Sequence, residues 1–180
     1  FFYKYYRPNN AILVIAGNIQ EADTLSLVEK WFGDIPHGEK LIRRLPVEPA
    51  QERLQKRINE ANVPVDALYM AFHTSDRFSE EYYPTDLISD VLGNGPSSRL
   101  FRKLLKEQQL VSSIDCYLTG SIDPGLLVVE GRPVDGVSLE QLEETIWKEL
   151  QKLCDEKLPE RELEKLKNKL ESNHEFSESS

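Results

Sequence analysis

Apolar and polar positions follow two different periods along the chain, and the period distinguishes predicted strands from predicted helices. A continuous apolar run at residues 11–17 predicts a buried strand. Apolar positions on one helical face predict a helix at 21–32, and Gly33 stands where a helix cap is expected. These residues therefore predict one strand-and-helix unit that cannot bury its apolar surface alone.

A second series of elements begins near residue 51. Alternating apolar and polar residues predict strands at 53–60, 66–74, 112–120 and 125–133. The last two strands are expected to form an antiparallel hairpin. Helical spacing predicts helices at 80–92, at 98–108, from Ser138 with Gln141 in a capping box, and from Pro159. The polar tail at 172–180 is expected to fray. Strands and helices in blocks predict an α+β fold, a mainly antiparallel sheet with helices packed on one face.

Composition places the chain among globular proteins. It has 180 residues, 39% hydrophobic and 29% charged, which suits one domain or a small domain with an appendage. The formal net charge of -9 argues against nucleic acid as a partner, because phosphate binding needs an excess of lysine and arginine. No apolar run is long enough to span a bilayer, so no membrane partner is expected. An acidic surface either attracts basic peptides or keeps the protein soluble, and we favour the second.

The cysteines and the first residue bear on the origin of the chain. Cys116 and Cys154 lie far apart without CxxC spacing, so a reduced pair is favoured over a disulfide. Because the chain starts at Phe1 and its only methionine is Met70, we expect an excised piece of a longer protein rather than a processed chain. The sequence assigns no compartment, and a soluble, cytoplasmic location is slightly favoured.

The stretch GNGPSSRLF at 93–101 is either a phosphate-binding loop or a turn between two helices. A P-loop needs a lysine after its second glycine, and a dinucleotide fingerprint needs a preceding strand; neither is present. We interpret the stretch as a helix corner, with Gly93 left-handed at the end of the first helix and Ser97 capping the second. The structural residues of this corner are Gly93, Gly95, Pro96, Ser97 and Arg99. Arg99 is expected to bind loop carbonyls or a carboxylate.

No catalytic or metal site is predicted within the chain. The three histidines, His37, His73 and His174, are far from one another in sequence, and neither HExxH nor HxxEH occurs. There is no GxSxG motif, and the serines lie at element ends, where serine caps helices or starts strands. Nucleophilic and zinc catalysis by this chain alone are therefore not expected.

Several segments, taken in order, resemble the insulinase/pitrilysin family of zinc metallopeptidases, which includes the processing peptidases. The resemblance covers nearly the whole chain, through FFYKYYRPNNAILVIAGN, the helix that ends in WFGDIP, and the long stretch LGNGPSSRLFRKLLKEQQLVSSIDCYLTGSIDPGLLVVEG. It implies homologous α+β domains, two per half, and two halves that close around a peptide. It also implies zinc held by an HxxEH helix and a downstream glutamate, on polypeptide upstream of this chain.

The same resemblance divides the chain. Residues 1–36 correspond to the last strand and helix of the upstream catalytic-type domain, 37–50 to a linker, and 51–180 to a truncated C-terminal domain without metal. Many members carry an arginine and a tyrosine that bind substrate in the pattern L-R-E-x-x-G-L-x-Y. Here Leu105 stands at the arginine and Ser112 at the tyrosine, so both substrate-clamp contacts are replaced.

The resemblance implies a fragment of a zinc metalloendopeptidase, here the non-catalytic C-terminal domain that forms the wall of the peptide chamber. The parent would bind zinc and a peptide substrate and pair with a second homologous half or subunit, as a homodimer or heterodimer. This chain alone is expected to be inactive and to bind no cofactor, because HxxEH is absent. The alternative is a non-catalytic scaffold or regulatory subunit of the same family. A third interpretation is an unrelated α+β binding module, but the ordered matches to the family would then have to be accidental.

Overall fold

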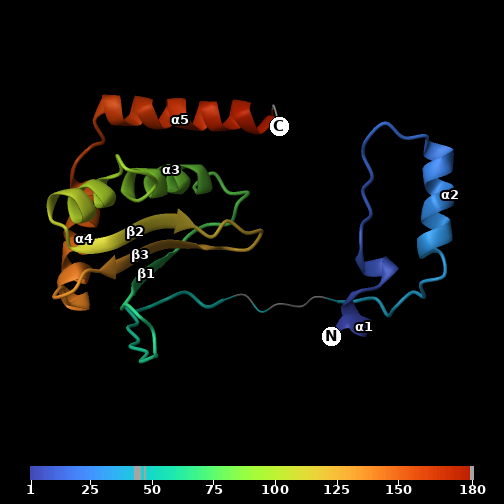
Figure 1. The fold of residues 1–180 in the computed structure, drawn as a ribbon, viewed down its shortest axis with the longest axis horizontal. Helices are drawn as coiled ribbons and strands as arrows, with labels where there is room; N and C mark the ends of the chain where they lie inside the picture. Colours follow the sequence, from blue (N-terminus) through green and yellow to red (C-terminus); the bar gives the residue numbers. More distant parts are fainter. Residues whose placement is uncertain (43–45, 47, 179–180) are drawn as a thin grey trace. The chain divides into compact units, whose positions relative to one another are not determined.

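A computed structural model describes residues 1–42, 46 and 48–178 of the chain (Figure 1). The chain separates into two compact units, Phe1–Ile58 and Asn59–Ser180. Part of the predicted linker, residues 43–45 and 47, lies outside the described residues, as do the last two residues of the tail. The domain boundaries near 36 and 50 stay predictions about a longer protein.

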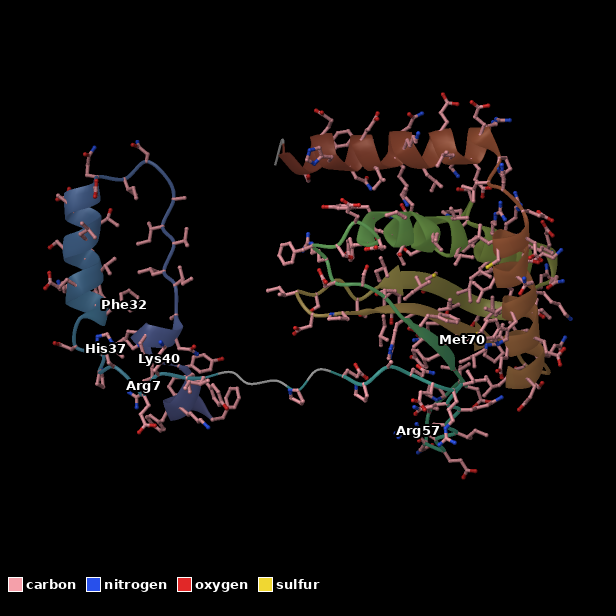
Figure 2. All side chains as sticks on the ribbon, turned by 180° about the vertical axis from the view of Figure 1, so that it is seen from behind. Arg7, Phe32, His37, Lys40, Arg57 and Met70 are labelled. Atoms are coloured by element: carbon pink, nitrogen blue, oxygen red, sulfur yellow. The ribbon has the colours of Figure 1, made fainter. Side chains whose placement is uncertain are left out.

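The first unit is built from short helices and extended segments. Its helices are α1 (Phe2–Tyr5), the 3-10 helix η1 (Pro8–Asn10) and α2 (Glu21–Phe32). The predicted helix at 21–32 is confirmed, and the Gly33 N–H donates to the Glu29 carbonyl at its end. The Asn9 side chain joins distant segments, accepting from the Gly38 N–H at 2.9 Å and donating to the Gly38 carbonyl at 3.2 Å. Figure 2 shows Arg7, His37 and Lys40 close together in this unit.

Two predicted strands do not form. Residues 11–16 form no strand, and their apolar side chains are exposed, Ile12 by 91% and Val14 by 80%. Residues 53–60 are likewise without strand pairing and exposed. A strand needs a neighbour to satisfy its N–H and C=O groups, and no strand within the described ranges pairs with either segment. The apolar run at 11–17 was therefore a valid sign of strand propensity but not of a strand in this structure.

The second unit contains a three-stranded antiparallel sheet in the order β1-β3-β2. Its strands are β1 (Leu68–His73), β2 (Val111–Leu118) and β3 (Leu126–Pro133). Met70 lies opposite Val129, which lies opposite Cys116, so these three side chains share one face. The predicted strands at 66–74, 112–120 and 125–133 and their hairpin are confirmed.

Four helices complete the second unit. They are α3 (Tyr82–Leu92), η2 (Phe101–Glu107), α4 (Leu139–Asp155) and α5 (Glu160–Glu178). η2 has the wider hydrogen bonding of a π-helix, and at its end the Gln108 N–H donates to the Lys103 carbonyl. The predicted cap of α4 by Ser138 is confirmed, because the Ser138 hydroxyl accepts from the Gln141 N–H at 3.2 Å. The prediction of a frayed tail is wrong for residues 172–178, which continue α5 as helix.

The hydrophobic core lies on one face of the sheet. Its cluster of buried side chains comes from all three strands and from α3, η2 and α4; it includes Met70, Leu92, Leu104, Cys116, Val129, Leu142 and Ile146. The predicted α+β fold with helices on one face of an antiparallel sheet is therefore confirmed. Alternation places a second set of side chains on what we call the open sheet face: Tyr69, Ala71, Asp115, Tyr117, Val128 and Glu130.

The last helix is attached by polar contacts more than by apolar ones. α5 lies beside α3 (Figure 1), and only Leu166 among its described side chains is buried. The Lys169 ammonium donates to the Asp90 carboxylate of α3 at 3.2 Å. In the part of the chain that the structure covers, no helix is both long and apolar enough to cross a membrane.

Gly93 ends α3, but not by the predicted left-handed conformation. Its φ is -134°, which any residue adopts. A Cβ built on Gly93 would overlap the backbone nitrogen and the Cβ of Cys116, so glycine is required here for close contact between α3 and β2. Gly95, with φ of +99°, is the residue of this turn that needs the conformational freedom of glycine.

Both cysteines are free thiols. Cys116 is buried beneath this contact, and burial raises the pKa of its thiol to about 12. Its role is therefore in packing rather than in thiolate chemistry.

Candidate functional site

The helix corner at residues 93–98 orients the cations that follow it. The Ser98 hydroxyl donates to the Gly95 carbonyl at 2.8 Å, and the Ser98 carbonyl accepts the helical bond from the Arg102 N–H. Leu100 and Leu104 are fully buried and fix the start of the next helix against the core. Because these leucines point inward, Arg102 and Lys103 are directed to the surface, and Arg99 is directed toward α5.

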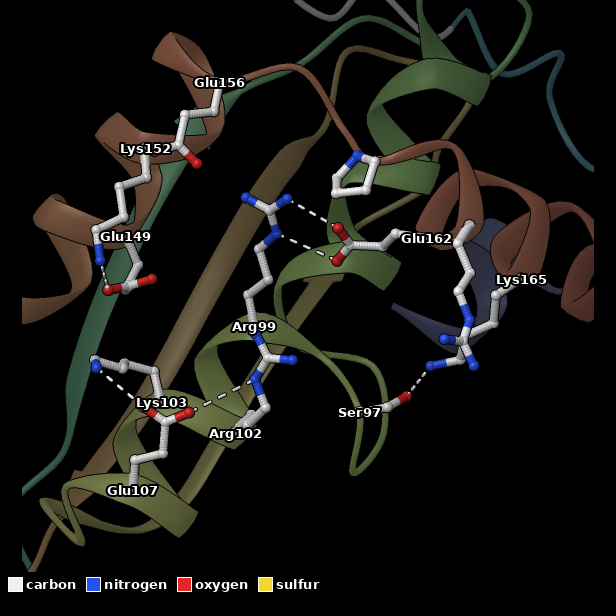
Figure 3. A pocket seen from close by; sticks show the side chains of 12 residues that line it. Ser97, Arg99, Arg102, Lys103, Glu107, Glu149, Lys152, Glu156, Glu162 and Lys165 are labelled. Carbon is white, nitrogen blue, oxygen red and sulfur yellow. Dashed lines mark hydrogen bonds and ion pairs between the residues drawn. The ribbon is translucent and has the colours of Figure 1, made fainter.

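The corner forms one wall of a charged groove of about 560 Å³ (Figure 3). η2 continues this wall, and the other walls come from the C-terminal half of α4 and the first turns of α5. Six cations line it: Arg99, Arg102, Lys103, Lys152, Arg161 and Lys165. The remaining lining residues are Ser97, Pro159 and four carboxylates, Glu107, Glu149, Glu156 and Glu162.

A two-point ion pair joins the corner to α5. The Arg99 Nη2 donates to the Glu162 Oε2 at 2.8 Å, and its Nε donates to Oε1 at 3.2 Å. The two side chains are only 14% and 27% exposed. The hydrogen bond from Arg99 lowers the pKa of the Glu162 carboxyl against the opposing effect of burial, and the same bond raises the pKa of Arg99. Parallel hydrogen bonds between charged groups are strong and directional, so this pair fixes the start of α5.

Two further carboxylates of the groove are also held by cations. The Lys152 ammonium donates to the buried Glu149 at 2.6 Å, and this bond raises the pKa of Lys152. Lys103 donates to Glu107 at 3.0 Å, and Arg102 lies farther from that carboxylate, at 3.7 Å. The bond from Lys103 lowers the pKa of Glu107.

Replacing Arg99 with alanine is expected to lower the free energy of unfolding by about 1–2 kcal/mol, because Glu162 would keep its partial burial without its partner. Chemical denaturation of the variant measures the change. Stability should decrease more than any binding of peptide. A larger loss in peptide binding than in stability would make Arg99 a substrate contact instead.

The pH dependence of a Glu162→Gln variant checks the same pair. Because the folded-state pKa of Glu162 is lowered, its contribution is complete above the ordinary glutamate pKa of about 4.3 and is lost as the pH falls through the lower folded value. The stabilities of the wild type and the variant should therefore differ most near neutral pH and converge in acid. A constant difference across this range would contradict the role of the ion pair.

The other predicted site residues lie at different places in the fold and do not form one site. Ser97 does not cap the second helix as predicted; its hydroxyl accepts from the Lys165 ammonium of α5. Leu105 packs at the margin of the hydrophobic core. Ser112 is exposed at an irregularity in β2, where its hydroxyl donates to the Arg132 carbonyl at 3.2 Å. That Leu105 and Ser112 replace a substrate clamp stays a prediction.

Sequence reasoning did not find the α5 side of the groove. Glu162 lies 63 residues after Arg99, and Lys165 lies 68 residues after Ser97. No local motif links them, and charges on a polar helix usually indicate only a solvated face. Pro159, which the sequence predicted at the start of the last helix, was the one usable signal, because it places the start of α5.

The described residues do not fit a zinc site. No three His, Cys, Asp or Glu side chains in the described ranges come together as a ligand set. Zinc in a catalytic site requires three protein ligands. No metal chemistry is therefore assigned to the residues of this chain.

Comparisons with known proteins give a consistent result. Residues 1–170 match the model of a family described as the peptidase M16 inactive domain. The uncharacterized zinc protease YmxG of Bacillus subtilis is 28% identical over 183 residues, which cover 94% of this chain and 40% of that protein. The chain thus spans about two fifths of the length of this relative.

Solved structures show the same fold. A protease from Helicobacter pylori has a TM-score of 0.83 at 22% identity, over 98% of this chain and 43% of that one. A conserved protein from Enterococcus faecalis has a TM-score of 0.73 at 19% identity, over 91% of this chain and 38% of that one.

Proposed function

Because the chain belongs to the family of the peptidase M16 inactive domain, as its insulinase-like resemblance predicted, we propose that it forms the wall of a peptide chamber. It is a non-catalytic C-terminal domain of a zinc-protease-like protein. The proposed parent would carry zinc and its ligands on other polypeptide. A second homologous half or subunit would close the chamber around the peptide substrate.

The observation that carries this proposal is the open sheet face. Helices cover one side of the sheet, whereas on the other side Tyr69 is 59% and Tyr117 41% exposed. Val128 lies opposite both Ala71 and Tyr117 but is itself only 8% exposed, so the accessible apolar area of this face comes from Ala71 and the two tyrosines. Acidic side chains flank it, and the Tyr69 hydroxyl is within 3.2 Å of the Glu130 carboxylate. Two exposed tyrosines on one sheet face are suited to an extended peptide, because tyrosine offers both apolar area and a hydrogen-bonding group.

We assign residues 1–36 of the first unit to an upstream domain. The exposed apolar side chains at 11–16 support this assignment, since a run of unpaired apolar residues is stable only when another surface covers it. In this proposal the segment completes a sheet to which the parent contributes the other strands.

A binding experiment with the 180-residue chain tests whether the open sheet face is the wall of a peptide chamber. An unstructured peptide of mixed composition, labelled with fluorescein, should bind, and the double variant Tyr69→Ala/Tyr117→Ala should weaken binding about tenfold through loss of two aromatic contacts. Tyr83→Ala on α3 is the matched control, because this tyrosine is 68% exposed away from the sheet. An equal loss in the control would contradict the assignment. Added zinc should give no hydrolysis, and metal-dependent cleavage by this chain would refute the non-catalytic role.

The alternative, a scaffold or regulatory subunit, is favoured by one observation. Leu105 packs against the core and Ser112 binds a backbone carbonyl, so neither offers the charged or phenolic contact of the substrate clamp. The upstream sequence of the parent decides between the two proposals. An intact HxxEH favours the peptidase, and a degenerate motif favours the scaffold.

A further inference from the structure

We propose that the charged groove is a second binding site, which takes an acidic peptide segment. The groove is lined by η2, α4 and α5, on the side of the sheet opposite the open sheet face. It does not depend on the proposed chamber wall, and different residues test it.

The charge balance of the groove is opposite to that of the protein. Six cations face four carboxylates there, whereas the whole chain has a formal net charge of -9. Three of the carboxylates, Glu107, Glu149 and Glu162, are already engaged by Lys103, Lys152 and Arg99. The groove therefore keeps a surplus of positive charge that its own glutamates do not neutralise.

The surplus is concentrated at the α5 side. No ion pair joins Arg161 or Lys165 to a carboxylate among the described residues. Lys165 donates to the Ser97 hydroxyl, and its charge helps to lower the pKa of the nearby Glu162 carboxyl. Arg102 is 66% exposed and 3.7 Å from its nearest carboxylate. The first turn of α5 carries Glu160 and Glu162, which offset the helix dipole there, so the surplus rests on these three side chains alone. An approaching anion thus finds two guanidinium groups and an ammonium group that keep most of their hydrogen-bonding capacity.

The form of the groove favours peptide carboxylates over phosphate. Its volume of about 560 Å³ is within the usual range for ligand sites, about 300–1,000 Å³, and exceeds what one phosphate fills. Figure 3 shows Arg99 between the Lys152 and Glu149 pair on one side and Lys165 on the other, so cations and carboxylates alternate. Densely charged phosphates would be repelled by the glutamates, whereas a peptide presents spaced carboxylates and also N–H donors for the exposed Glu156.

Fluorescence anisotropy with a labelled oligoglutamate peptide tests the site on the 180-residue chain. The peptide should bind at low ionic strength and weaken as salt is added, whereas an oligolysine peptide of equal length should not bind. The variant Arg161→Glu/Lys165→Glu should weaken binding at least about tenfold. Lys148→Glu/Lys167→Glu is the matched control: it changes the net charge equally at two lysines outside the groove, and its affinity should stay within about twofold of the wild type.

The outcomes separate the site from its competitors. Absence of oligoglutamate binding would overturn the proposal. An equal loss of affinity in both double variants would also overturn it, because it would show that the peptide is attracted to the overall charge alone. Displacement of the peptide by an equal concentration of inorganic phosphate would overturn the peptide assignment. Circular dichroism checks that each variant is folded. If the double variant does not fold, the affinity of the single variant Arg161→Glu is measured in its place. The Tyr69→Ala/Tyr117→Ala variant should bind oligoglutamate normally, so failure of this site and failure of the chamber wall are distinguishable.

Discussion

Replacing Gly93 with alanine is expected to lower the free energy of unfolding by about 3 kcal/mol, because overpacking of a close helix-strand contact forces the backbone to move. The added Cβ would overlap the backbone nitrogen and the Cβ of Cys116 in β2. Backbone atoms of a strand that is hydrogen-bonded to its neighbour cannot give way as a flexible side chain does. Urea denaturation followed by far-UV circular dichroism measures the loss.

Gly95→Ala is the control for this prediction, since it lies two residues away in the same turn. A Cβ at Gly95 meets no atom within 4 Å, so only its φ of +99° opposes the substitution, at a cost of about 1 kcal/mol. If Gly95→Ala destabilised the protein more than Gly93→Ala, the turn conformation and not the helix-strand contact would be the reason for glycine at the corner.

Replacing Leu142 with alanine is expected to lower the free energy of unfolding by about 3 kcal/mol, through lost burial and the cavity left behind. Leu142 is fully buried and joins α4 to the sheet. Gly131 in β3 makes this approach possible, because a Cβ there would be 3.2 Å from the Leu142 side chain. Thermal and urea unfolding should agree on the loss.

Leu170→Ala on α5 is the matched control for Leu142. It removes the same atoms from a side chain that is 38% exposed, so its cost should be below about 1 kcal/mol. Equal losses at the two positions would show that α5 contributes to the core as much as α4 does.

The sequence was sufficient to predict those elements whose interaction partners lie close along the chain. The hairpin of β2 and β3 and the cap of α4 depend on residues a few positions apart, and the structure confirms them. The helices followed from apolar spacing, and their packing on one face of the sheet followed from the order of the elements.

The sequence misled where the outcome depends on distant residues. The apolar run at 11–17 has strand propensity, but pairing requires another strand, and propensity carries no information about whether one is present. At Gly93 the sequence showed that a helix ends, yet only the structure places Cys116 against it. The charged groove was missed for the same reason, because α5 contributes Glu162 and Lys165 from far along the chain.

The polar attachment of α5 has a consequence for how the domain loosens. Its polar contacts with the rest of the unit lie at Ser97, Arg99, Asp90 and the Asn94 carbonyl, and Leu166 is the one side chain of the helix that the structure describes as buried. Detachment of such a helix exposes little apolar surface to water. The heat-capacity change of this local unfolding is therefore small, and its free energy depends only weakly on urea concentration. The unit can therefore release α5 by local unfolding while the sheet and the other helices stay assembled.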